Sequence, residues 1–210
     1  MPYFKNNQIN LLFIHIPKTG GSSLEVYFSR IFNTSLTADT LYTTSHLRIE
    51  GVSYQHQTYE SIVRNNNIFN IDFNRLSILT IVRNPYTRIL SELLEKKKIN
   101  SDSSTNEVHS AIKDYLSFEA DSKNTFDNHR LPQYLFITES ENLIPDINIL
   151  RTENLTNDMK KIGYDDFNLN IRKNKFNEGN NYFKLLNNYS IQLINEYYKQ
   201  DFILFNYEMI

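Results

Sequence analysis

The chain has 210 residues, 40% of them hydrophobic and 22% charged, so we expect a single globular domain over residues 1–210 with a substantial core. Its formal net charge of −2 excludes a general attraction to nucleic acid or acidic membranes. The chain has no cysteine, which excludes disulfides, thiolate nucleophiles and cysteine metal sites. We find no secretory signal and no apolar run near the ~18 residues that span a bilayer, so we expect a soluble, cytoplasmic protein.

The first predicted unit is a strand, a glycine loop and a helix. Apolar residues 11–16 predict a buried parallel strand, and residues 22–32 predict a helix with one apolar face. The loop PKTGG between them is typical of an anion cradle, because glycines let backbone N–H groups approach a ligand and the helix N-terminus carries partial positive charge. Lys18 adds a cation. It precedes the paired glycines, whereas nucleotide kinases have the order G-x-x-x-x-G-K-[ST].

A second strand and helix follow in the middle of the chain. Residues 33–55 have a mixed pattern with a short strand expected at 41–44, and residues 57–64 predict a short helix. The run LSILTIV at 76–82 predicts another buried parallel strand. Asn84 is a good N-cap and Pro85 a good first helical residue, so we expect a helix over 85–98.

The remaining elements complete an α/β pattern. We expect helices at 107–119, 154–162 and 187–200, and strands at 132–138 and 147–151. Strands that alternate with helices favour an α/β, P-loop-like three-layer fold with a central parallel β-sheet flanked by helices. Ligands of such sheets bind beyond the carboxyl ends of the strands. The glycine loop and the turn at 83–85 both follow strands, so we expect one ligand with two separate charged groups.

Two segments together resemble a known family. HIPKTGGSS at 15–23 and VRNPYTRILS at 82–91 resemble motifs of the sulfotransferases that use 3′-phosphoadenosine 5′-phosphosulfate (PAPS), in the carbohydrate branch with the heparan and chondroitin enzymes. The resemblance implies that the first motif holds the 5′-phosphosulfate and the second holds the 3′-phosphate. It implies 3′-phosphoadenosine 5′-phosphate as product. We expect no metal, because this chemistry requires none and the sequence shows no cluster of metal ligands. The implied cofactor-binding residues are Lys18, Thr19, Gly20, Gly21, Ser22, Ser23, Arg83, Ser91 and Lys175.

Weaker similarity extends over most of the chain. QHQTYESI at 55–62, NHRLPQYLFIT at 128–138, ILRTENL at 149–155 and DFILFNY at 201–207 resemble later family segments. The second of these implies acceptor binding by His129, Arg130 and Gln133. The sequence also departs from the family, because Glu92 and Leu93 follow Ser91 where many relatives have aromatic residues.

The expected catalytic residues are Lys18 and His56. Lys18 would stabilise the charge on the leaving oxygen, and His56 would take the acceptor proton, since histidine titrates near neutral pH. The alternatives for the base are His46, His109, His129 and Glu25. Arg88 is expected to be structural or solvated.

We therefore expect transfer of a sulfuryl group from PAPS to a hydroxyl of a carbohydrate acceptor by in-line displacement. A P-loop small-molecule kinase is one alternative, although the kinase residue order is missing. A non-catalytic nucleotide- or glycan-binding module is another, although Lys18, Arg83 and Ser91 are all present. The expected partner is a saccharide or other hydroxyl-bearing acceptor, with no nucleic acid and no membrane insertion.

Overall fold

A four-stranded sheet lies at the centre of the computed structural model, which describes residues 2–33, 47–117, 126–168 and 182–210. The strand order is β1–β2–β5–β8; β2, β5 and β8 are parallel, and β1 pairs antiparallel with β2. The mixed α/β fold with a mostly parallel sheet is therefore confirmed, and the antiparallel edge strand was not predicted. The strands are β1 (Tyr3–Lys5), β2 (Asn10–Ile14), β5 (Ser77–Val82) and β8 (Ile147–Arg151).

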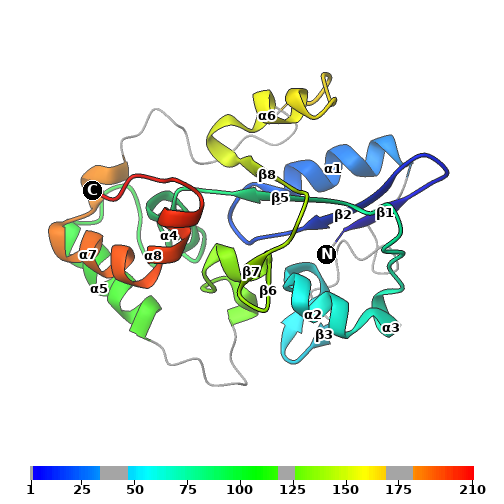
Figure 1. Ribbon diagram of the computed structural model, residues 1–210. Coiled ribbons are helices and arrows are strands. Elements are labelled where there is room, and N and C mark those ends of the chain that lie inside the picture. Colours follow the sequence, from blue (N-terminus) through cyan, green and yellow to red (C-terminus); the bar gives the residue numbers. More distant parts are fainter. Residues whose placement is uncertain (1, 34–46, 118–125, 169–181) are drawn as a thin grey trace.

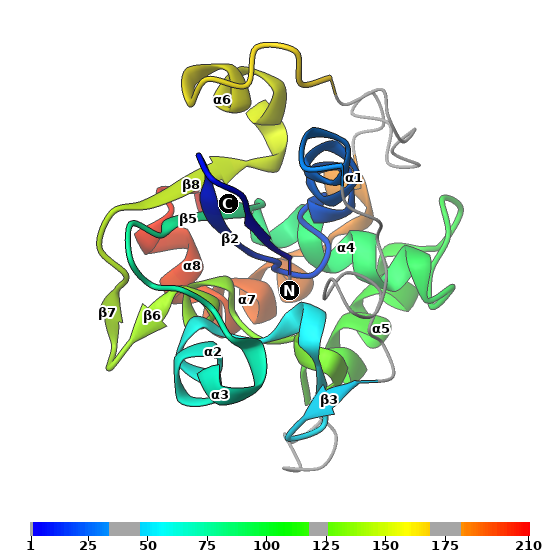
Figure 2. The same cartoon turned by 90° about the vertical axis from the view of Figure 1, so that its right-hand side faces the viewer.

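Each face of the sheet is covered by helices. Leu12 and Ile78 belong to the hydrophobic core that includes side chains of α2 and α3, whereas Phe13 and Leu79 belong to the core that includes side chains of α1 and α6. Figures 1 and 2 show these helix pairs on opposite sides of the sheet. Burial on both faces explains why these strands are continuous apolar runs. The helices are α1 (Gly21–Ile31), α2 (Tyr59–Arg64), α3 (Asn66–Phe69) and α6 (Leu155–Lys161).

A third core lies among the helices that gather beyond the end of β5 (Figure 1). Tyr86, Ile112, Ile194 and Phe202 are all buried in it. Its first helix begins as predicted, because Pro85 is its first residue and Asn84 Oδ1 accepts a hydrogen bond from Tyr86 N at 3.0 Å. The helices are α4 (Pro85–Glu95), α5 (Thr105–Ser117), α7 (Asn188–Tyr197) and α8 (Lys199–Leu204).

Two predicted elements differ from the structure. The strand expected at 132–138 is wrong, because the segment forms the 3₁₀ helix η3 (Gln133–Phe136). Its turn is stabilised by Asp201, whose carboxylate accepts hydrogen bonds from Gln133 N at 2.8 Å and Tyr134 N at 2.9 Å. The helix expected at 187–200 is instead two helices, α7 and α8, which are separated by Tyr198. The strand expected at 41–44 lies outside the described residues.

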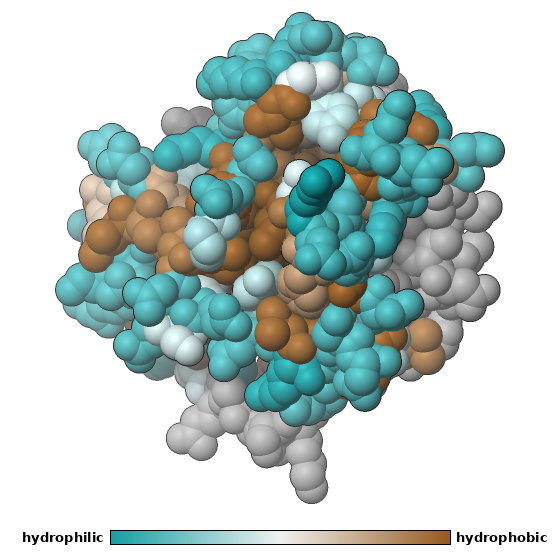
Figure 3. Space-filling model, turned by 45° about the vertical axis from the view of Figure 1, so that its right-hand side comes forward, coloured by the Kyte–Doolittle hydropathy of each residue, from teal (hydrophilic) through white to brown (hydrophobic). Residues whose placement is uncertain are grey.

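Short strands and 3₁₀ helices connect the larger elements. On the surface, most of the face in Figure 3 is hydrophilic, with hydrophobic side chains between hydrophilic ones. No helix within the described ranges combines the length and apolar character that a membrane span needs. The short pairs are β3 (Arg48–Ile49) with β4 (Val52–Ser53), and β6 (Thr138–Glu139) with β7 (Asn142–Leu143). The other 3₁₀ helices are η1 (Tyr54–His56), η2 (Phe126–Asn128), η4 (Thr152–Asn154) and η6 (Tyr182–Leu185).

Candidate active site

The glycine loop joins the end of β2 to α1. Lys18 (φ 69°) and Gly20 (φ 90°) both have left-handed backbone conformations, which turn the chain sharply into the helix. The N-cap residue is Gly20, which has no side chain to bond the first N–H groups of α1. Thr19 is buried, and its hydroxyl donates to Ile16 O at 2.9 Å. The hydrogen bond of Thr19 thus holds the loop against the end of β2, and the loop leads into a helix N-terminus suited to an anion.

Arg83 follows β5 and lies beside the glycine loop. Its Nη1 donates to Lys18 O at 3.1 Å, and its Nε donates to Thr87 Oγ1 at 3.0 Å. Ser91 is half-buried on α4, the helix that follows Arg83, and lies about two turns beyond the start of this helix. Because β2 and β5 are adjacent and parallel, the two predicted anion-binding segments lie at one edge of the sheet.

Lys18 points toward α4 and pairs with Glu95. The two side chains form an ion pair in which Lys18 is 13% exposed and Glu95 is 67% exposed. The side chain of Lys18, the predicted leaving-group cation, is therefore largely buried, and its ammonium group is held by an exposed carboxylate. A negatively charged ligand at the loop would compete with Glu95 for this ammonium group.

Two further residues of the motifs stabilise the loops. Arg88 is buried, and it donates to three backbone carbonyls, those of Pro17 (3.1 Å), Leu131 (3.0 Å) and His129 (3.0 Å). Arg88 therefore ties the glycine loop to the 129–131 segment. Gln133 is also buried; its Oε1 accepts from Arg83 N at 2.9 Å and its Nε2 donates to Arg83 O at 2.8 Å.

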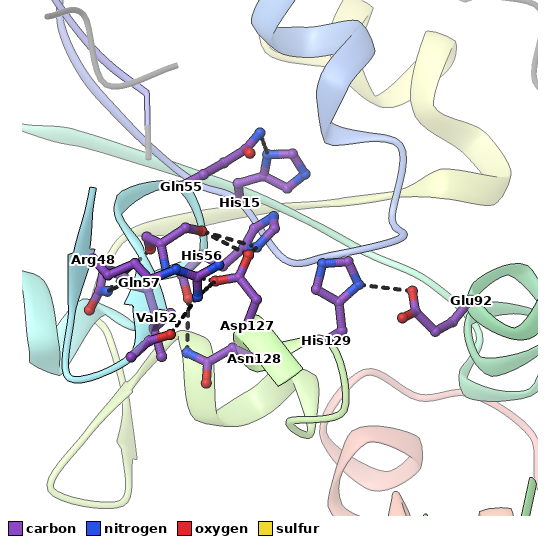
Figure 4. A network of polar contacts seen from close by, with 12 residues as sticks. His15, Arg48, Val52, Gln55, His56, Gln57, Glu92, Asp127, Asn128 and His129 are labelled. Atoms are coloured by element: carbon purple, nitrogen blue, oxygen red, sulfur yellow. Dashed lines mark hydrogen bonds and ion pairs between the residues drawn. The ribbon is translucent and has the colours of Figure 1, made fainter. Parts of the chain in front are cut away.

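Three histidines form a row next to this edge of the sheet. Figure 4 shows the rings of His15, His56 and His129 in succession. The His15 and His56 ring centroids are 5.3 Å apart, and those of His56 and His129 are 4.9 Å apart, with each pair nearly perpendicular. Each histidine has its own carboxylate partner, so the row carries three imidazoles and three acids.

His56, the predicted base, is buried in the middle of the row. Its Nδ1 lies 2.8 Å from Asp127 Oδ2, and Asp127 also accepts hydrogen bonds from Ser53 N (2.6 Å) and Ser53 Oγ (3.0 Å). Burial lowers the pKa of His56 to about 4, although the hydrogen bond to Asp127 acts in the opposite direction. Burial acts to raise the pKa of Asp127, but the contacts with His56 and Ser53 outweigh it and lower that pKa. His56 is therefore neutral at pH 7, as a base must be.

Glu25, the alternative base, is buried in α1 beside His15. Its Oε1 lies 2.5 Å from His15 Nδ1 and accepts from Gln55 Nε2 at 3.0 Å. Burial acts to raise the pKa of Glu25, but the charge and hydrogen bond of His15 and the bond from Gln55 lower it. His15 and Gln55 enclose this carboxylate. It lies beside His15, at the end of the histidine row away from His129.

His129 completes the row on the side of α4. Its Nδ1 lies 2.8 Å from Glu92 Oε2, and Glu92 also pairs with Lys96 at 3.2 Å. Burial acts to raise the pKa of Glu92, but the contacts with His129 and Lys96 lower it. The neighbouring Arg130 is buried, with Nη1 donating to Tyr115 O at 3.3 Å and its guanidinium over the Phe126 ring at 5.0 Å.

Other candidates lie elsewhere. His109 is on α5, with Nδ1 3.3 Å from Ser190 Oγ. His46 and Lys175 lie outside the described residues. The sequence reasoning missed Asp127, which lies in a polar segment with no local pattern, and gave Glu92 no role. One indication for Glu92 was present in the sequence: it is a charged residue at a position where many relatives have an aromatic one.

Comparison with known proteins gives one match. A family model described as "Sulfotransferase family" matches residues 1–208, which include every site residue described above. No curated protein and no solved structure matches the chain.

Proposed function

We propose a donor and an acceptor for this chain from one premise, that it belongs to the sulfotransferase family and is a sulfotransferase. The proposed donor is PAPS, and the proposed acceptor is a hydroxyl group of a carbohydrate. Family membership also argues against the small-molecule kinase and the non-catalytic module.

The contact between Arg83 and the glycine loop is the observation that carries the donor proposal. Arg83 Nη1 lies 3.1 Å from Lys18 O, so two cationic side chains and a helix N-terminus lie at adjacent strand ends. A ligand with anionic groups at two separate positions fits this arrangement, and PAPS has a 5′-phosphosulfate and a 3′-phosphate. In the proposal, Lys18 and residues 19–23 bind the 5′ group, whereas Arg83 and Ser91 bind the 3′-phosphate.

The proposed mechanism is a single displacement at sulfur. The acceptor oxygen forms a bond to sulfur as the bond from sulfur to the 5′-phosphate oxygen breaks, and the acceptor proton passes to His56. Asp127 orients the His56 ring and stabilises the imidazolium that forms. Lys18, released from Glu95, stabilises the charge that develops on the leaving oxygen.

On the acceptor side, we propose direct contact by His129 and supporting roles for Arg130 and Gln133. The His129 ring lies against His56, and Glu92 fixes its orientation. The side chains of Arg130 and Gln133 are already bonded within the protein, to Tyr115 O and to the backbone of Arg83. These bonds support a role in shaping the acceptor segment and in holding Arg83 at the donor.

Ligand-dependent thermal stability tests the donor. At ~100 times its Kd, 3′-phosphoadenosine 5′-phosphate should stabilise the folded chain by about 2.7 kcal/mol. ATP with Mg²⁺ should have a smaller effect, because ATP lacks a 3′-phosphate. Stabilisation by ATP with Mg²⁺ alone would contradict the donor proposal.

Transfer of radiolabelled sulfate from PAPS to a panel of glycans tests the reaction. We expect His56→Ala to lower kcat by about 10²–10⁴-fold with donor binding intact, whereas the matched His109→Ala variant should keep full turnover. In the free enzyme, kcat/KM should fall on the acid side near pH 4, because that profile reports the base before ligands bind. Full turnover by His56→Ala would exclude His56 as the base, and donor binding without transfer to any glycan would contradict the acceptor.

A further inference from the structure

Two imidazoles of the histidine row and one carboxylate, all of them groups that bind metal ions, lie close together. His56, Asp127 and His129 each offer one ligand atom, and these atoms all lie within 4.8 Å of one another. His56 ends η1, and Asp127 and His129 flank Asn128. Phe126, Asp127 and Asn128 have consecutive left-handed conformations (φ 46°, 56° and 61°), and this tight turn carries both side chains to His56.

We propose that His56, Asp127 and His129 bind one divalent transition-metal ion such as Zn²⁺, and that the bound ion inhibits sulfuryl transfer. We infer inhibition because the ion would occupy His56, the proposed base, and so prevent this ring from taking the acceptor proton. The binding of the ion stands apart from the proposed function; only the inhibition depends on His56 being the base.

The donor set selects the class of metal. Two imidazoles and one carboxylate suit Zn²⁺, Co²⁺ and Ni²⁺, whereas Mg²⁺ and Ca²⁺ prefer oxygen ligands. Bonds of about 2.1 Å separate neighbouring donors by roughly 3.4 Å in a tetrahedral site. The His56–Asp127 pair is at 2.8 Å and all three donors lie within 4.8 Å, so shifts of about 1 Å would complete the coordination.

The surroundings already orient two of the ligands. Glu92 Oε2 lies 2.8 Å from His129 Nδ1, which leaves Nε2 of that ring for an ion. A carboxylate on the far nitrogen of an imidazole is the usual outer shell of a metal-binding histidine. Asp127 is held by Ser53 through N at 2.6 Å and Oγ at 3.0 Å. The side chains of His56 and Glu92 are 11% and 3% exposed, so little reordering is needed on binding.

Metal binding by protein without an affinity tag tests the site directly. We expect one Zn²⁺ per chain by equilibrium dialysis and a visible absorption band with Co²⁺. Affinity for Zn²⁺ should fall by at least tenfold in His129→Ala and in Asp127→Asn, and by about 10–100-fold in Glu92→Gln. The matched variant His109→Ala should bind as wild type, and Mg²⁺ should not displace Co²⁺.

NMR signals of the histidine ring protons, recorded on the wild-type protein, test the site even if a variant fails to fold. Of the five histidines, only those of the row should shift on Zn²⁺ addition, with His56 and His129 affected most. No binding at 1 mM Zn²⁺, unchanged affinity in His129→Ala and Asp127→Asn, or shifts confined to His46 or His109 would each overturn the proposal.

Inhibition is measured separately from binding. We expect Zn²⁺ to inhibit sulfate transfer over the concentration range in which it binds. Binding without inhibition would overturn the inhibitory role. Failure to detect transfer with any glycan would contradict the proposed acceptor and leave the binding measurements as the test of the metal site.

Discussion

The ring of His15 lies directly against Gly21, the first residue of α1. A Cβ atom built on Gly21 would lie 2.7 Å from both Cδ2 and Nε2 of His15. The second glycine of the loop is therefore needed for close packing against the histidine row, and its contact with His15 joins the predicted donor loop to that row, whose next ring is the predicted base His56. His15 itself is positioned by Glu25, at 2.5 Å.

Gly21→Ala should therefore destabilise the protein. Overpacking of a buried site costs about 1–3 kcal/mol, and each kcal/mol lowers Tm by roughly 2–4 °C for a chain of this size. Gly21→Ala should lower the stability less in the His15→Ala background than in the wild-type protein, because the ring that causes the clash is then absent. Thermal melts of the four proteins give the coupling, and independent effects of the two substitutions would contradict the contact.

The free energy of unfolding should fall as the pH is lowered from about 6.5 to about 4. Burial lowers the pKa of folded His56 to about 4, whereas an exposed histidine has a pKa near 6.5. Between these values the unfolded chain binds the proton and the folded chain does not, so this contribution is fully present above pH 6.5. It amounts to about 3 kcal/mol. Urea denaturation of wild type and His56→Gln across this range checks it; equal slopes would contradict the assignment.

Arg83 and Arg88 should respond differently to substitution although they lie on the same motif. Arg83→Lys keeps the charge but loses the planar fork, so affinity for 3′-phosphoadenosine 5′-phosphate should fall by about 10–100-fold. Affinity for adenosine 5′-phosphosulfate, which has no 3′-phosphate, should change little. Calorimetric titration of both ligands measures the ratio, and an equal loss for both would exclude Arg83 as the 3′-phosphate ligand.

Arg88 provides the matched comparison. Arg88→Met removes the donor to three backbone carbonyls, so Tm should fall by several degrees. The ratio of the two ligand affinities should stay at the wild-type value in this variant. A changed ratio would mean that Arg88 contacts the ligand.

Glu95→Gln should strengthen donor binding. Glu95 is an exposed carboxylate paired with Lys18, so its removal frees the ammonium group for the ligand. An exposed ion pair contributes up to about 1 kcal/mol, which corresponds to at most about a fivefold fall in Kd for 3′-phosphoadenosine 5′-phosphate. Glu60→Gln, on α2, is the control for the loss of one surface charge. Weaker binding in Glu95→Gln than in this control would contradict competition between Glu95 and the ligand.

Local sequence patterns were sufficient for the central elements. Strands β2 and β5 lie in apolar runs, and Asn84 with Pro85 specifies the start of α4. Strand β8, which mixes apolar and polar residues, was predicted with its observed bounds. The 3₁₀ turn at Gln133 could not be predicted in this way, because Asp201, 68 residues further along the chain, binds its N–H groups. Edge strand β1 was missed because three residues next to a polar segment give no clear period.

Residues close in sequence specify the parallel strands, the glycine loop and the two cationic motifs, because each depends on neighbours within one turn or one strand. Which acid pairs with each histidine depends on the tertiary fold. His56 and Asp127 are 71 residues apart, and His129 and Glu92 are 37 apart. Such pairs form because burial makes an unpaired charge costly, and the fold selects which distant carboxylate is within reach.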